Sequence, residues 1–131
     1  MTKTVFANGC FDILHRGHIE LLEFAKQHGD RLVIGLNSDK SVKKLKGETR
    51  PFNNESDRKK VLESIRYVDE VIIFDEETPY KLIKRICPDI IVKGGDYVAT
   101  NVVGSDLCEV LIFDLIDGYS STQILQNSGN R

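Results

Sequence analysis

The sequence contains little of what marks a secreted, membrane-spanning or nucleic-acid-binding protein. Its 131 residues include three cysteines, three prolines and one methionine, and no tryptophan. Cys10, Cys87 and Cys108 lie far apart without a CxxC pair, so the sequence indicates neither a disulfide framework nor a zinc site. No apolar run approaches the roughly 20 residues of a membrane span, and no signal-peptide pattern follows the N-terminus. We therefore expect a cytoplasmic protein that has no membrane partner.

The charge balance gives no sign of polyanion binding and is typical of a globular chain. With 18 basic and 20 acidic residues the formal net charge is -2, so nucleic acid is not an expected partner. Hydrophobic residues make up 40% and charged residues 29%, which is too apolar for disorder. The length matches one domain, and we expect a single domain over residues 1–131 with a polar tail from about residue 127.

Short apolar runs alternate with stretches of helical periodicity. Five runs rich in Val and Ile predict strands at Thr4–Ala7, Arg31–Leu36, Glu70–Phe74, Ile90–Val92 and Val110–Phe113. Apolar spacing and capping residues predict helices at 18–28, 54–65, 78–86 and about 120–126. The alternation predicts an α/β fold: a single-domain, Rossmann-like, doubly wound open parallel sheet of about five strands with helices on both faces. Ligands of such sheets bind beyond the carboxyl ends of the strands.

The segment 38–53 is the longest stretch without a clear period. Its basic residues are Lys40, Lys43, Lys44, Lys46 and Arg50. Long loops in compact domains are often functional. Because these five charges repel one another until an anion arrives, we expect a mobile loop here; the alternative is a solvated helix turn followed by a loop.

Two histidines flank a glycine where the first predicted strand passes into the first helix. Gly17 lets the backbone approach a ligand closely, and the helix beginning near His18 offers N–H groups and a positive dipole end to a phosphate. Imidazole donors from His15 and His18 would stabilise phosphate charge. Two alternatives are a metal site, although no third ligand is near in sequence, and unrelated surface histidines. Neither a GxGxxG nor a GxxxxGK[ST] phosphate loop is present.

The ten residues from Gly9 to His18 read Gly-Cys-Phe-Asp-Ile-Leu-His-Arg-Gly-His, and they resemble the G-x-F-D-x-x-H-x-G-H signature of the cytidylyltransferase-like nucleotidyltransferases. Further similar motifs follow in order: Asn37-Ser38-Asp39, Leu45-Lys46-Gly47, Arg50-Pro51, Arg58 with Tyr67-Val68-Asp69, Val92-Lys93-Gly94-Gly95-Asp96-Tyr97 and Gly118-Tyr119-Ser120-Ser121-Thr122. The resemblance covers the chain from Val5 to about Leu125. Within the family the chain is most similar to the nucleotidyltransferase domain of bacterial ADP-heptose synthesis, with glycerol-3-phosphate cytidylyltransferase as a sibling.

This resemblance implies an enzyme that transfers a nucleoside monophosphate from a nucleoside triphosphate to a sugar phosphate and releases pyrophosphate. Adenylyl transfer to a heptose 1-phosphate is the leading hypothesis, because the motifs are most similar to that domain and because Leu115 stands where the cytidylyltransferase branch has an arginine. The alternatives are cytidylyl transfer to glycerol 3-phosphate or another polyol phosphate, and a catalytically inactive nucleotide-binding module. Mg²⁺ would be carried on the triphosphate without a protein metal site, and relatives commonly form homodimers.

The same resemblance implies three groups of site residues. The catalytic group is His15, His18, Lys46 and Ser121. The nucleotide-binding group is Gly9, Phe11, Gly17, Lys93, Gly94, Ser120 and Thr122. The acceptor-binding group is Asp12, Asp39, Arg58 and Asp96. Asp12 and Arg58 are also candidates for ordering the loops around the site. The acceptor phosphomonoester, with a second pKa of about 6, is already anionic at neutral pH, so no general base is required.

Overall fold

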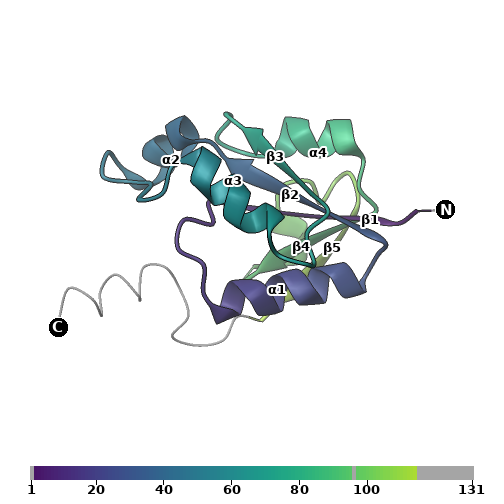
Figure 1. The fold of residues 1–131 in the computed structure, drawn as a ribbon. Helices are drawn as coiled ribbons and strands as arrows, with labels where there is room; N and C mark the ends of the chain where they lie inside the picture. Colours follow the sequence, from purple (N-terminus) through teal and green to yellow (C-terminus); the bar gives the residue numbers. More distant parts are fainter. Residues whose placement is uncertain (1, 96, 115–131) are drawn as a thin grey trace.

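The computed structural model describes residues 2–95 and 97–114, and Figure 1 shows how their strands and helices alternate. In chain order the elements are β1 (Thr4–Gly9), α1 (Arg16–Gln27), β2 (Arg31–Asn37), α2 (Asp39–Lys46), α3 (Glu55–Glu63), β3 (Glu70–Phe74), α4 (Tyr80–Ile86), β4 (Ile90–Gly94), the 3₁₀ turn η1 (Ala99–Asn101) and β5 (Glu109–Phe113). Each predicted strand is present, and β1 and β4 extend two residues further than predicted, to the glycines that end them.

The strands of the described sheet are all parallel and lie in the order β3-β2-β1-β4-β5. Val5 and Phe6 are neighbours on β1 and point to opposite faces of the sheet, and both are 0% exposed. Central strands of this sheet are therefore covered on both sides, as the near-continuous apolar runs in the sequence indicate. The predicted Rossmann-like open parallel sheet is confirmed.

Each face of the sheet has its own hydrophobic core. On one face Leu22 of α1 and Leu62 of α3 pack with Val5. On the other face Ile83 of α4 packs with Phe6. Figure 1 shows α1 and α4 on opposite sides of the strands. Because full burial of an aliphatic or aromatic side chain contributes about 1.5–3 kcal/mol, these two layers hold the strand ends, and the loops that leave them, in fixed positions.

The order of the strands reverses at β1. The chain leaves β1 through α1 to reach β2, whereas it enters β4 only later, through α4 on the opposite face. Crossovers that diverge in this way leave a crevice beyond the carboxyl ends of the two strands. Gly9 ends β1 and Gly94 ends β4, so this crevice lies between two of the motifs that carry the family resemblance.

The segment 38–53 contains a helix, α2, followed by a loop, which agrees with the alternative prediction for this segment; its mobility stays a prediction. Ser38 is its N-cap and accepts a hydrogen bond from the Ser41 backbone N–H at 3.1 Å, while Val42 is buried at 0% exposure. Exposed lysines occupy most of the other positions, so the apolar period is too weak to reveal the helix. Gly47 ends α2 with a φ of 104°, a backbone conformation that favours glycine.

Helix α1 and the η1 turn differ from the predicted elements. Helix α1 begins at Arg16, two residues before the predicted start, because His15 serves as its N-cap. The η1 turn has no counterpart among the predictions, and the predicted helix at about 120–126 lies outside the described residues.

None of the helices in residues 2–95 and 97–114 is long and apolar enough to cross a membrane.

Candidate active site

His15 and His18 cap the N-terminus of α1. Nδ1 of His15 accepts a hydrogen bond from the Gly17 backbone N–H at 3.0 Å, and Nδ1 of His18 accepts one from the His15 backbone N–H at 3.3 Å. Since each ring uses Nδ1 as an acceptor, these hydrogen bonds assign the proton of the neutral ring to Nε2. The ring centroids lie 4.0 Å apart. The start of the helix thus carries two imidazole N–H donors beside its own backbone N–H groups.

The surroundings keep both rings uncharged near neutral pH. Burial, together with smaller effects of the neighbouring charges of His15 and Lys46, lowers the pKa of His18 to about 4. Burial also lowers the pKa of His15. Phe11 contributes to the covering, since its ring centroid lies 5.7 Å from that of His18. Neutral imidazoles that use Nδ1 as an acceptor are suited to donating hydrogen bonds to an anion rather than to removing a proton from one.

A cavity of about 460 Å³ opens at the carboxyl ends of β1, β2 and β4. It brings together three residues that the sequence assigns to the phosphates or the nucleotide: Gly9, Lys46 and Lys93. Its volume lies in the range of small-molecule sites, roughly 300–1,000 Å³. Lys46, the last residue of α2, is exposed and lines the cavity from the C-terminus of that helix, where a cation is favoured.

Lys93 supplies a partly desolvated positive charge near the end of β4. Burial lowers the pKa of its ammonium group, against an opposing effect of the Cys10 thiol. The Nζ atom lies 5.1 Å from the centroid of the Tyr97 ring, within the range of a cation–π interaction. Coulombic attraction is stronger where water is partly excluded, so this ammonium group is well suited to meet a phosphate. Its predicted contact with the nucleotide stays a prediction.

The Asp12 carboxylate is bound by other parts of the chain. It accepts hydrogen bonds from the backbone N–H groups of Phe52 at 2.8 Å and Asn53 at 2.9 Å, and it pairs with Nε of Arg50 at 3.1 Å. Burial raises the pKa of Asp12, but these donors outweigh burial and hold the pKa below its usual value. The side chain is 1% exposed and holds the connection between α2 and α3, and its predicted role in acceptor binding stays a prediction.

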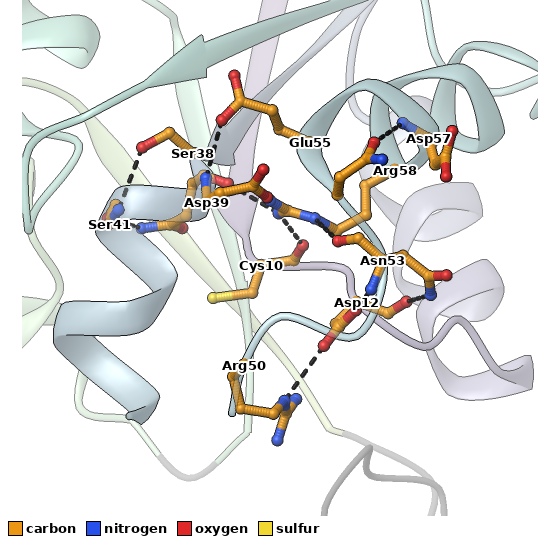
Figure 2. A network of polar contacts seen from close by, with 12 residues as sticks. Cys10, Asp12, Ser38, Asp39, Ser41, Arg50, Asn53, Glu55, Asp57 and Arg58 are labelled. Carbon is orange, nitrogen blue, oxygen red and sulfur yellow. Dashed lines mark hydrogen bonds and ion pairs between the residues drawn. The ribbon is translucent and has the colours of Figure 1, made fainter. Parts of the chain in front are cut away.

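Arg58 joins several chain segments at the carboxyl edge of the sheet, as Figure 2 shows. Its Nη1 donates to the carbonyl oxygens of Cys10 at 2.8 Å and Asn37 at 2.7 Å, and its Nε donates to that of Asn53 at 2.8 Å. Its Nη2 pairs with the Asp39 carboxylate at 2.8 Å. The side chain is 1% exposed, and these contacts fit its alternative predicted role as a loop partner; its acceptor-binding role stays a prediction. Asp39 remains one-third exposed, and its acceptor role stays a prediction.

The remaining predicted residues have different positions. A Cβ on Gly9 would approach the Phe11 ring to 3.2 Å, so this glycine lets the ring pack close to the backbone. Gly17 is buried in the first turn of α1, and Gly94 ends β4 beside the cavity-lining Lys93. Asp96, Ser120, Ser121 and Thr122 lie outside the described residues, and their roles stay predictions.

Sequence reasoning missed two features of this site. Asp12 was a candidate for ordering a loop, but nothing in the pattern showed that it would pair with the Arg50-Pro51 segment. Nothing in the pattern pointed to Glu77 and Asn101, which line the cavity. Within residues 2–95 and 97–114 no group of three or more His, Cys, Asp or Glu side chains is placed to hold a metal ion.

Comparison with known proteins supports the motifs over most of the chain. A profile of the family described as cytidylyltransferase-like matches residues 6–127. The bifunctional protein HldE of Aliarcobacter butzleri (strain RM4018) is 55% identical over 125 residues, which are 95% of this chain and 26% of that protein. HldE of Campylobacter fetus subsp. fetus is 57% identical over 122 residues, which are 92% of this chain and 27% of that protein. The chain therefore spans about a quarter of the length of these curated relatives.

Two solved structures show the same fold. The lipopolysaccharide core biosynthesis protein from Thermoplasma volcanium GSS1 superposes with a TM-score of 0.73 at 30% identity, covering 88% of this chain and 98% of that one. Pantoate-beta-alanine ligase from Francisella tularensis, complexed with beta-gamma ATP and beta-alanine, superposes with a TM-score of 0.63 at 16% identity, covering 98% of this chain and 69% of that one. At that identity the ligase supports the fold alone.

Proposed function

Since this chain belongs to the cytidylyltransferase-like family, we propose that it transfers an adenylyl group from ATP to a heptose 1-phosphate and releases pyrophosphate. The family makes it a nucleotidyltransferase. Support for the heptose acceptor comes from the resemblance of its motifs to the nucleotidyltransferase domain of ADP-heptose synthesis and from relatives named HldE that are 55% and 57% identical. Because the chain spans about a quarter of those bifunctional relatives, the proposal is limited to this one reaction.

The observation that supports the proposal is that two sets of donors lie near the carboxyl end of β1. His15 and His18 cap the N-terminus of α1, which follows β1. Lys46 and Lys93 line the cavity together with Gly9, the last residue of β1, and the charge of Lys46 acts on His18. Two polyanionic substrates need such an arrangement, because each brings several negative charges to the reacting phosphorus.

In the proposed reaction an anionic oxygen of the acceptor phosphate attacks the α-phosphorus of ATP. The bond from the α-phosphorus to the bridging oxygen of the β-phosphate breaks, and pyrophosphate leaves with the bonding electron pair. The attacking oxygen needs no deprotonation. The protein is therefore required to align the two phosphates and to neutralise the charge that develops on them.

The donors of this chain match those two tasks. Nε2–H groups of His15 and His18 donate to the phosphate oxygens that gain charge in the transition state. Lys46 and Lys93 offset the charge on the cavity side, where Lys93 is already partly desolvated. The nucleotide substrate is the magnesium complex of ATP. In this proposal the triphosphate oxygens hold the magnesium ion.

A matrix of substrates tests the proposal. The four nucleoside triphosphates are combined with heptose 1-phosphate, glycerol 3-phosphate and other sugar or polyol phosphates, and pyrophosphate release is measured, with His15→Ala as the inactive control. We expect ATP with heptose 1-phosphate to give the highest rate. Turnover only with CTP and glycerol 3-phosphate supports the cytidylyltransferase alternative. Nucleotide binding without turnover on any acceptor contradicts the proposal.

A further inference from the structure

The cavity at the switch point is lined by side chains of different chemistry. Its lining includes Lys46 and Lys93, the two cations that the proposed reaction uses. It also includes Glu77 and Asn101, which come from the loop after β3 and from η1. The cavity thus combines ammonium groups suited to a phosphate with a carboxylate and an amide suited to hydroxyl groups.

The wall that carries Glu77 is fixed to the rest of the site. Oγ of Ser41, a residue with 0% exposure on α2, donates to the Glu76 carbonyl oxygen at 3.0 Å. The same Oγ accepts a hydrogen bond from Nδ2 of Asn37 at 2.9 Å. This serine therefore links the end of β2 to the loop after β3. The backbone that carries Glu77 is thereby tied to α2, the helix that carries Lys46.

Glu77 and Asn101 are exposed side chains of the cavity lining. Within the described part of the chain the carboxylate of Glu77 has no hydrogen bond or ion pair, and the side-chain amide of Asn101 has no hydrogen bond. By contrast, the chain itself supplies hydrogen-bond partners to Asp12 and Arg58, two buried residues first assigned to the acceptor. Glu77 and Asn101 are therefore open to the hydroxyl groups of a molecule in the cavity.

We propose that Glu77, assisted by Asn101, is the specificity-determining contact for the hydroxyl groups of the acceptor, whose phosphate lies against Lys46 and Lys93. This inference rests on the proposed function and adds the residue that selects the acceptor. A carboxylate accepts hydrogen bonds from two hydroxyls, and the cavity of about 460 Å³ has room for a sugar phosphate. A short acceptor such as glycerol 3-phosphate reaches fewer of these groups.

The test compares two neutralising substitutions at neighbouring positions. Glu77→Gln changes the cavity wall, and Glu76→Gln makes the same chemical change on an adjacent, exposed side chain that does not line the cavity. We expect Glu77→Gln to lower kcat/KM for heptose 1-phosphate by about tenfold or more, through KM for the acceptor, with KM for ATP unchanged. With glycerol 3-phosphate the loss is smaller, and Glu76→Gln matches the wild type throughout. Equal thermal midpoints confirm that both variants fold.

Direct binding separates this inference from the proposed function. Titration calorimetry with heptose 1-phosphate is run on the wild type and both variants in the presence of a non-hydrolysable ATP analogue. Weaker binding only in Glu77→Gln supports the inference, even if no transfer is found and the proposed reaction is thereby contradicted. Wild-type transfer with an unchanged acceptor KM and unchanged binding in Glu77→Gln overturns the inference and leaves the proposed function standing. Failure of the wild type to bind the sugar phosphate overturns both.

Discussion

The backbone N–H of His15 donates to Nδ1 of His18 at 3.3 Å, while the ring of His15 caps the same helix through the Gly17 N–H. The two histidines therefore hold each other in one geometry and in one tautomer. Their spacing in the sequence, with a glycine between, is what the first turn of a helix needs for this arrangement. A structural role as a helix cap and a chemical role as a pair of Nε2–H donors follow from the same hydrogen bonds.

Removal of either imidazole should abolish most of the activity. We expect His15→Ala and His18→Ala each to lower kcat by about 100-fold or more, since one preorganised donor at a developing anion contributes about 3–4 kcal/mol. Steady-state rates of pyrophosphate release measure the effect. His28→Gln is the matched control, because His28 lies at the opposite end of α1 and bonds to the Phe24 carbonyl oxygen. Near-wild-type turnover in either alanine variant contradicts the assignment.

The low pKa of His18 should appear in the pH dependence of stability. The folded-state pKa of about 4 lies below the ordinary value of 6.5, so the unfolded chain binds a proton first as the pH falls. This contribution to stability is present above about pH 6.5 and is lost as the pH falls to about 4, by an amount on the order of 1–3 kcal/mol. Urea unfolding of the wild type and His18→Gln at several pH values measures it. Parallel curves for the two proteins would falsify the expected shift.

We predict that Arg58 contributes to the free energy of unfolding. Arg58→Ala leaves the carbonyl oxygens of Cys10, Asn37 and Asn53 without their buried donor, and we expect a loss of about 3 kcal/mol or more in the free energy of unfolding. Arg58→Lys keeps the charge but lacks the planar fork, so it restores only part of the stability. Arg85→Ala, on an exposed position of α4, serves as the control. An unfolding midpoint of Arg58→Ala equal to that of the control contradicts this role.

We predict that Lys46 binds phosphate groups of the substrates and contributes little to the stability of the fold. We expect Lys46→Ala to lower kcat/KM by about tenfold or more without lowering the thermal midpoint, as loss of a charged hydrogen bond does. Lys44→Ala is the control, because Lys44 is exposed on the same helix and does not line the cavity. Slower tryptic cleavage between Lys40 and Arg50 when ATP is bound would show that the segment closes on phosphates. Equal losses of activity in the two variants contradict a specific role for Lys46.

The sequence predicted the architecture of this protein because two independent signals agreed. Apolar runs predicted the strands, and the ten-residue motif ending at His18 located the loop after β1. Together they indicated where the switch point of the sheet lies. The same motif predicted phosphate-binding histidines whose capping geometry the structure shows. Helix α2 could not be predicted in this way, since its one fully buried apolar residue, Val42, is surrounded by lysines.

Charged residues were the harder part of the site to predict. Asp12 and Arg58 stand in motifs that resemble those of the family, and sequence alone cannot tell a carboxylate that binds a substrate from one that binds a loop. The distinction depends on contacts across 38 residues between Asp12 and Arg50 and across 48 between Cys10 and Arg58. Glu77 shows the converse, because no motif marks it and only the fold brings it to the cavity.

The ratio of kcat/KM for ATP to that for CTP, with heptose 1-phosphate as the common acceptor, tests the central claim most directly. Leu115, which lies outside the described residues, has no side-chain donor, whereas we expect the arginine of the cytidylyltransferase branch at this position to donate to a pyrimidine carbonyl or a phosphate. An unpartnered carbonyl costs about 1–3 kcal/mol, so we expect ATP to be preferred by roughly ten- to a hundredfold. A clear preference for CTP contradicts the adenylyltransferase account and assigns the chain to the cytidylyl branch of its family.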